Sequence, residues 1–164
     1  MSDDSAPFAR GDFDRIYRAE RLAVHRHLVF ITGDRALADD LTQETFGKLY
    51  DRPPAEPLRN ARAWLLTVAS NLACNHLRGE TRRRDRETRA DSAPAADVDD
   101  VLDVRRALAA LDPRDGVMLL LRHSGFSYAE IAEAVGLAPA SVGTVLARAQ
   151  RRFREAYEGP GVRE

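Results

Sequence analysis

The sequence predicts an all-α fold of two small helical domains joined by a flexible linker, with a helix-turn-helix in the second domain. Apolar residues recur three and four positions apart through most of the 164 residues, and no strand-like alternation of useful length occurs. Residues 85–100 hold no large apolar side chain except Val98. Such a segment cannot bury enough surface to offset its ordering entropy. We therefore expect domains at 8–84 and 100–158, and a linker at 85–99.

The first domain is expected to contain three main helices. Asp12 can cap the first, whose apolar face runs from Phe13 to Ile31. Gly33 ends it, and Asp34 caps a second helix that carries Leu37, Leu41, Thr45 and Leu49 on one face. Pro53, Pro54 and Pro57 make the next stretch a stiff loop. The third helix is expected at about 60–78, with Trp64, Leu65, Val68 and Leu72 inward.

The second domain is expected to contain four helices. The first covers about 100–111, and Asp112-Pro113 supplies a cap and a first-turn proline for the next, which closes at Gly125. Ser127 and Glu130 then form a capping box. Gly136 can adopt the positive φ of a sharp turn, and Pro139 starts the last helix. This pattern favours a DNA-binding helix-turn-helix over an ordinary helical hairpin.

Composition limits the chemistry that the chain can carry. The net charge is −1, so a basic DNA-binding face must be balanced by acidic surface elsewhere. The single cysteine, Cys74, excludes an internal disulfide and a cysteine-rich zinc site. We expect no metal and no cofactor. We expect the histidines at the surface or at helix ends, not clustered with Cys74 around a metal; they are His25, His27, His76 and His123.

Membrane and export signals are not expected. No apolar run approaches the length of a membrane span, and the acidic start at Met1–Asp4 does not resemble a signal peptide. We therefore expect a cytoplasmic protein without membrane insertion.

Three segments resemble one family. Gly33–Phe46 resembles the second conserved region of sigma-70-type factors, and Ala63–Ala73 resembles the adjoining promoter-melting helix. Ser127–Arg151 resembles the fourth region. Together, in this order, they resemble a group IV, extracytoplasmic-function sigma factor over nearly the full chain. Some members carry an extra carboxy-terminal sensing domain, which we do not expect because the chain ends at Glu164.

The resemblance implies a polymerase-binding face on the second helix. In the family this acidic helix docks on the clamp helices of the β′ subunit of core RNA polymerase, and complementary charge speeds such an encounter. The implied partners are core RNA polymerase (β′ and β subunits) and promoter DNA, and the family also allows an anti-sigma factor. The alternative is a solvated acidic face, and Phe46 is either an anchor at the interface or part of the core. The candidate residues are Asp39, Asp40, Gln43, Glu44 and Phe46.

The resemblance also implies two DNA-binding sets. On the third helix, amides can bond to base edges of the melted −10 element, and arginines can contact phosphates. On the last helix, residues near the amino end should face the major groove of the −35 element, and the arginines should reach phosphates. For the −10 set, the alternative is that Asn71 and Asn75 are plain surface amides. The −10 set is Asn71, Asn75, Arg78, Arg82 and Arg83; the −35 set is Ser141, Thr144, Arg148, Arg151 and Arg152.

The predicted function is that of a sigma factor, which binds core polymerase and directs promoter-specific transcription initiation through the −35 and −10 elements. The alternative is a two-domain helix-turn-helix regulator that acts without docking on core polymerase. An enzyme is disfavoured, because the sequence shows no nucleophile–base pair, no Gly-rich phosphate loop and no metal cluster.

Overall fold

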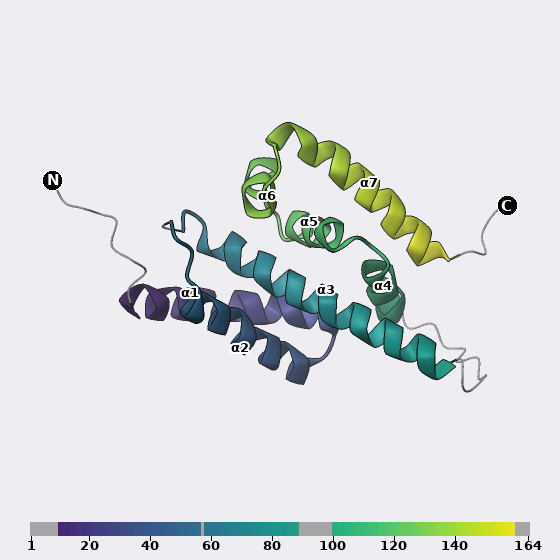
Figure 1. Ribbon diagram of the computed structural model, residues 1–164, viewed down its shortest axis with the longest axis horizontal. Helices are drawn as coiled ribbons and strands as arrows, with labels where there is room; N and C mark the ends of the chain where they lie inside the picture. Colours follow the sequence, from purple (N-terminus) through teal and green to yellow (C-terminus); the bar gives the residue numbers. More distant parts are fainter. Residues whose placement is uncertain (1–9, 57, 89–99, 160–164) are drawn as a thin grey trace.

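The computed structural model describes residues 10–56, 58–88 and 100–159, and within these ranges the regular structure is entirely helical (Figure 1). The predicted all-α class is therefore confirmed. The helices are α1 (Arg10–Thr32), α2 (Arg35–Asp51), α3 (Ala61–Thr88), α4 (Asp100–Ala109), α5 (Pro113–His123), α6 (Tyr128–Val135) and α7 (Pro139–Glu158).

Helices α1, α2 and α3 pack on one another to form the first half of the molecule. Leu28 of α1, Leu49 of α2 and Leu65 of α3 are fully buried between them. Gly33 takes a φ of +62° at the turn after α1, a conformation that a Cβ would strain. The three helices that the apolar spacing predicts are thus present.

Helix α3 is longer than predicted. It extends ten residues beyond Arg78, so residues 85–88, which were expected to begin the linker, are helical. The extra turns are rich in Arg and Glu, which are good helix formers without an apolar face, and the Arg86 Nε donates to the Arg82 carbonyl at 3.2 Å. The rest of the expected linker, 89–99, lies outside the described residues.

The second half contains α4 to α7, with the predicted caps in place. Asp112 accepts from the Arg114 amide at 3.3 Å ahead of α5. At α6 the Ser127 hydroxyl accepts from the Glu130 amide at 3.2 Å, and the Glu130 carboxylate accepts from the Ser127 amide at 2.7 Å. Gly136 has a φ of +70°, and α6 and α7 meet at 91°. This is the predicted helix-turn-helix.

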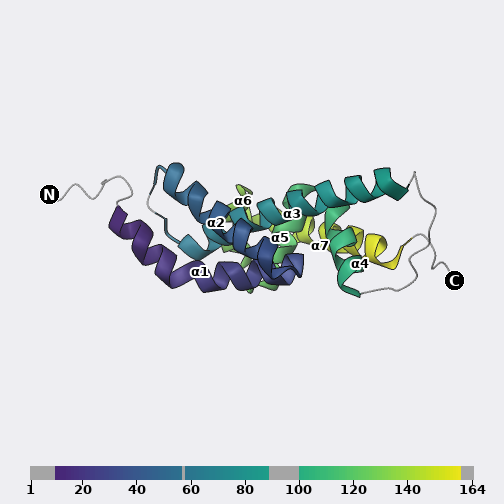
Figure 2. The same cartoon turned by 90° about the horizontal axis from the view of Figure 1, so that it is seen from below.

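The two halves are not independent of each other. Helix α3 packs against α4, α5 and α6 as well as against α1 and α2, so the second half lies along one side of α3 (Figures 1 and 2). Buried apolar side chains of both halves form one continuous core that includes Leu77, Leu108 and Leu121. The two helical domains expected from the sequence are thus present, and the structure adds that they pack against each other.

No single helix among the described residues is long and apolar enough to cross a membrane. The bent pair α6 and α7 meets these requirements of length and composition only when the two helices are taken together.

Candidate protein and DNA interfaces

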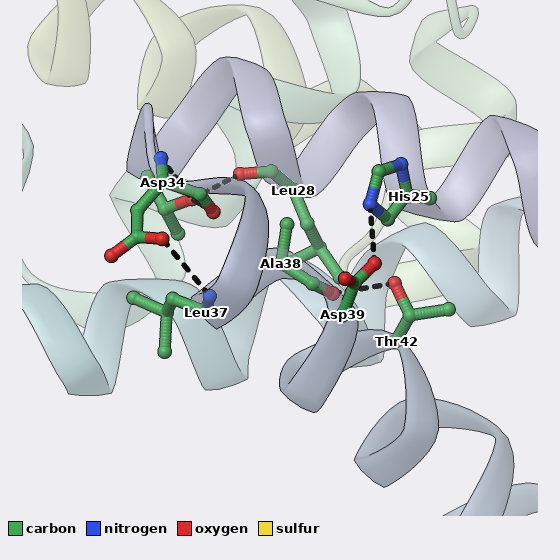
Figure 3. A network of polar contacts seen from close by, with 8 residues as sticks. His25, Leu28, Asp34, Leu37, Ala38, Asp39 and Thr42 are labelled. Carbon is green, nitrogen blue, oxygen red and sulfur yellow. Dashed lines mark hydrogen bonds and ion pairs between the residues drawn. The ribbon is translucent and has the colours of Figure 1, made fainter.

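The acidic face of α2 is exposed, as predicted for Asp39, Asp40, Gln43 and Glu44. A network of polar contacts at the α1–α2 turn fixes the direction of this face (Figure 3). Asp34 caps α2 by accepting from the Leu37 amide at 3.1 Å. The His25 Nε2 lies 2.8 Å from Asp39 Oδ1, and the Asp39 side chain remains 72% exposed. The helix therefore presents these carboxylates to solvent.

Phe46 does not belong to that exposed face. Its side chain is only 3% exposed and makes an edge contact with the Tyr17 ring, with centroids 4.9 Å apart. Of the two roles left open by the sequence, the core role is the correct one. The anchoring role is not available, because Phe46 points toward α1 and not toward solvent.

The predicted −10 residues share α3. Asn71 and Asn75 are exposed, and Arg82 and Arg83 are exposed further along the helix. Arg78 is half-buried, and its Nη1 donates to Asn75 Oδ1 at 3.3 Å. Spacings of four, three and four from Asn71 to Arg82 place amides and guanidinium groups along one side of the helix. The structure thus brings four members of the set together as a polar strip, and Arg83 lies about 100° around the helix from it.

The predicted −35 residues share α7. Ser141 and Thr144 are exposed near its amino end, and Arg148, Arg151 and Arg152 are exposed further along. The helix is held against the rest of the second half by Val142, Leu146 and Ala149, which are buried on its other side. The recognition helix therefore leaves its polar side available to a DNA groove.

Asp115 is a site residue that the sequence interpretation missed. This carboxylate is 2% exposed, in the first turn of α5, and lies 3.3 Å from Arg148 Nη2 and 3.9 Å from Arg152 Nη1. Two of the three candidate phosphate-binding arginines thus also neutralise a buried charge. Nothing in the spacing of the sequence indicated the partners of Asp115 on α7.

His27 is a second residue placed differently from the prediction. It is 8% exposed, not at the surface or at a helix end, and its spacing from Val24 and Ile31 on the apolar face of α1 could have indicated burial. Nε2 lies 2.7 Å from Ser70 Oγ on α3, and Nδ1 lies 3.3 Å from Ser124 Oγ after α5. Burial, with a smaller contribution from the charge of His123, lowers the pKa of His27 to about 4.

The hydrogen-bond partners define which ring nitrogen of His27 carries the proton. Ser124 donates its hydroxyl to the Leu120 carbonyl at 3.0 Å, so its oxygen is left to accept from Nδ1–H. The Ser70 hydroxyl then donates to the unprotonated Nε2. A neutral imidazole therefore joins α1, α3 and the end of α5.

Family models identify the class of protein that carries this arrangement of an acidic helix, a polar helix and a helix-turn-helix: the sigma-70 factors of transcription. Sigma-70 region 2 matches residues 16–83, and sigma-70 region 4 matches residues 102–153. The chain is 30% identical to the ECF RNA polymerase sigma factor SigL of Mycobacterium tuberculosis, over 90% of this chain and 89% of SigL. The chain belongs to the extracytoplasmic-function group of the sigma-70 family.

Two further comparisons show how far the likeness extends. The chain is 28% identical to the probable ECF sigma factor SigI of M. tuberculosis over 85% of this chain, and it spans about half of SigI (53%). The fold matches the sigma factor RpoE of Bartonella quintana, solved with the anti-sigma factor NepR, at a TM-score of 0.54 and 23% identity. That match covers 91% of this chain and 98% of RpoE. It supports the fold.

Proposed function

We propose that this chain binds core RNA polymerase and directs promoter-specific transcription initiation in the cytoplasm, and that it is not itself an enzyme. The observation that carries the proposal is the presence in one chain of two separate exposed surfaces. One is the acidic face of α2, and the other is the polar side of α7 in the helix-turn-helix. A regulator that acts without docking on core polymerase needs only the second.

We assign the three surfaces to three steps. The acidic face of α2 docks on the β′ subunit of the polymerase, and contacts to the β subunit complete the complex. The polar strip of α3 reads the −10 element once it is melted, since amides can pair with base edges that a duplex hides. The amino end of α7 reads the −35 element in the major groove, while its arginines bind phosphates.

We also infer that an anti-sigma factor restrains this chain, in keeping with the partner of the RpoE structure. An open groove of about 600 Å³ lies between the end of α1 and helices α4, α5 and α7. Phe30 and Tyr157, which line it, are 56% and 41% exposed, and Arg122 and Arg154 line it too. An amphipathic helix with acidic flanks would match this combination of apolar and basic side chains.

The anti-sigma assignment is tested with the product of the neighbouring reading frame, if that frame encodes a membrane protein with a cytoplasmic helical segment. The purified segment is titrated into the wild-type chain and into the variant Arg122→Glu/Arg154→Glu. Charge reversal should weaken binding at least about tenfold, which corresponds to about 1.4 kcal/mol. Equal affinity for both chains would overturn the assignment of the groove.

The proposed function itself is tested by transcription from a pool of genomic DNA fragments with purified core polymerase. Adding the chain should produce transcripts with defined 5′ ends from a small set of fragments. A helix-turn-helix regulator of the rival kind would leave the products of core polymerase unchanged.

A further inference from the structure

Asp115 is a buried carboxylate between α5 and α7. It is 2% exposed in the first turn of α5, and these two helices pack against each other. Its Oδ1 accepts a hydrogen bond from Arg148 Nη2 at 3.3 Å, and its Oδ2 lies 3.9 Å from Arg152 Nη1. One carboxylate thus contacts two guanidinium groups that are about one helical turn apart on α7.

Stability alone is a poor explanation for this buried charge. A buried ion pair costs the hydration of both groups, and an apolar residue of similar volume often stabilises a protein equally well. Oδ2 of Asp115 is buried and has no hydrogen-bond donor among the residues that the structure describes. The carboxylate is therefore only partly satisfied, and its clearest effect is on the position of the two arginines.

Both arginines keep donors for a second partner. The Arg148 side chain is 45% exposed and the Arg152 side chain is 55% exposed, although each lies beside a buried group. A guanidinium carries five N–H donors in a rigid fork, and the contact with Asp115 uses one nitrogen of each fork. The remaining donors can bind a phosphate, in bidentate geometry where two of them face it. Two arginines also exceed one carboxylate by one positive charge, so the cluster still attracts an anion.

The position of the cluster on α7 suits the DNA backbone. Arg148 follows Thr144 by one turn, and Thr144 is exposed near the amino end that we assign to the major groove. Phosphates border that groove, so a long side chain one turn beyond the base-reading residues can reach them. An arginine side chain loses rotamer freedom when it binds, and a side chain that is already held loses less. A held guanidinium therefore binds a phosphate at a lower entropic cost than a free one.

We propose that Asp115 is a positioning residue for DNA binding, which holds the guanidinium groups of Arg148 and Arg152 in the orientation that binds phosphates beside the −35 element. The proposal rests on the proposed function. Asp115 keeps its contacts when DNA is bound, because release of both arginines would leave a buried carboxylate unpaired. A carboxylate that instead competes with phosphate for the arginines would have effects of the opposite sign. Arg151, exposed about 100° around α7 from Arg152, is the internal comparison.

The first experiment measures the order of the guanidinium groups in the free chain, without polymerase or DNA. Nitrogen-15 relaxation of the Nε–H groups, assigned with Arg148→Lys and Arg151→Lys, should show Arg148 to be as rigid as the backbone of α7 and Arg151 to be mobile. Asp115→Asn, which removes the charge and keeps the shape of the side chain, should make Arg148 mobile and leave Arg151 unchanged. Asp115→Leu should do the same, so a folding defect of one variant cannot decide the result. A mobile Arg148 in the wild-type chain, or a rigid one in both variants, would overturn the proposal.

The second experiment measures the phosphate contacts themselves. The probe is a promoter fragment found by the transcription assay, in which one phosphate at a time beside the −35 element is replaced by a neutral methylphosphonate. Its binding to the complex of core polymerase with the chain gives a penalty at each position, which is the ratio of the Kd values for modified and unmodified DNA. Arg148→Ala and Arg151→Ala identify the phosphates that each arginine binds, because the penalty disappears there in the matching variant.

The penalties in Asp115→Asn then decide between the two effects of the carboxylate. At the Arg148 phosphate the penalty should fall from about tenfold in the wild-type chain to about twofold or less, because the guanidinium is no longer held. At the Arg151 phosphate it should be unchanged. An equal or larger penalty at the Arg148 phosphate in the variant would overturn the proposal, since the carboxylate would then only compete with DNA. A wild-type chain with no penalty at any position would instead contradict the DNA-binding role of α7 in the proposed function.

Discussion

At the scale of single residues, Arg148 and Arg151 differ in their contact with a buried carboxylate, although we propose the same phosphate-binding role for both. Arg148 lies 3.3 Å from the buried carboxylate of Asp115, whereas Arg151 is exposed on the same helix. Removing one partner of a charged hydrogen bond leaves the other group incompletely satisfied. The two arginines should therefore respond differently to the same substitution.

We predict that Arg148→Ala lowers the free energy of unfolding by about 1–3 kcal/mol, while Arg151→Ala changes it by less than about 0.5 kcal/mol. Each should reduce the salt dependence of binding to a −35 duplex by roughly one unit of slope for the lost phosphate contact. Denaturant unfolding and salt titrations measure the two effects. Equal destabilisation by the two variants would contradict the structural role of Arg148.

His27 predicts a dependence of stability on pH. Its pKa is about 4 in the folded chain and about 6.5 when unfolded, so the unfolded chain binds more protons between these values. The free energy of unfolding should therefore fall as the pH drops through this range, by about 2 kcal/mol between pH 7 and pH 5. His27→Gln should lose this part of the pH dependence in urea unfolding. An identical pH dependence in the variant would rule out His27 as its source.

At the scale of helices, the boundaries that depend on caps were predictable, and those that depend on composition were not. Asp34, Asp112 and the Ser127 box cap the helices expected from the sequence, because capping uses local hydrogen bonds. The end of α3 was missed because its last turns carry no apolar face. Phe46 was ambiguous for a similar reason: helical spacing does not show which face a ring will bury.

The acidic face of α2 is tested by charge reversal. Asp40→Lys/Glu44→Lys should weaken binding to core polymerase at least about tenfold, since complementary charge is lost, and should leave the helical content unchanged. Asp14→Lys/Glu133→Lys reverses two exposed carboxylates outside α2 and is the matched control. Equal core affinity of the two double variants in a fluorescence titration would remove the assignment of this face.

The division of DNA roles between α3 and α7 predicts selective rescue. Asn71→Ala/Asn75→Ala should spare binding to duplex DNA and impair opening at −10, because these amides face the single strand in our proposal. A template with a preformed mismatched bubble should then partly restore transcription. The variant Arg148→Ala/Arg151→Ala should not be restored in this way. Equal rescue of the two variants would show that the roles are wrongly divided.

At the scale of the whole molecule, the packing of the halves was the largest feature that the sequence did not reveal. The contacts involve a histidine, small residues and serines, such as His27, Gly116 and Ser124, whose spacing indicates no binding face. The polar composition of 85–100 favoured independence instead. The family pattern was recoverable because its motifs are local, whereas pairing between distant surfaces depends on three-dimensional complementarity.

Cleavage between the halves provides a direct view of this packing. A protease site inserted between residues 94 and 95 should yield two fragments. These should stay together in gel filtration, because the contacts between the halves remain after the peptide chain is cut. The same cleavage in Gly116→Val should release them, because a Cβ on Gly116 would already lie 3.4 Å from the Cys74 sulfur of α3 and the added methyl groups would push the helices apart. Fragments of the wild-type sequence that separate completely at micromolar concentration would show that the interface is weaker than the structure implies.

The most direct measurement of the central claim is the mapping of transcript 5′ ends produced by core polymerase from genomic fragments with and without the chain. If the chain is a promoter-specificity subunit, it should create a discrete set of start sites that share two separate upstream motifs. Asp40→Lys/Glu44→Lys should abolish these start sites. Transcript ends that are the same with and without the chain would contradict its role as a sigma factor.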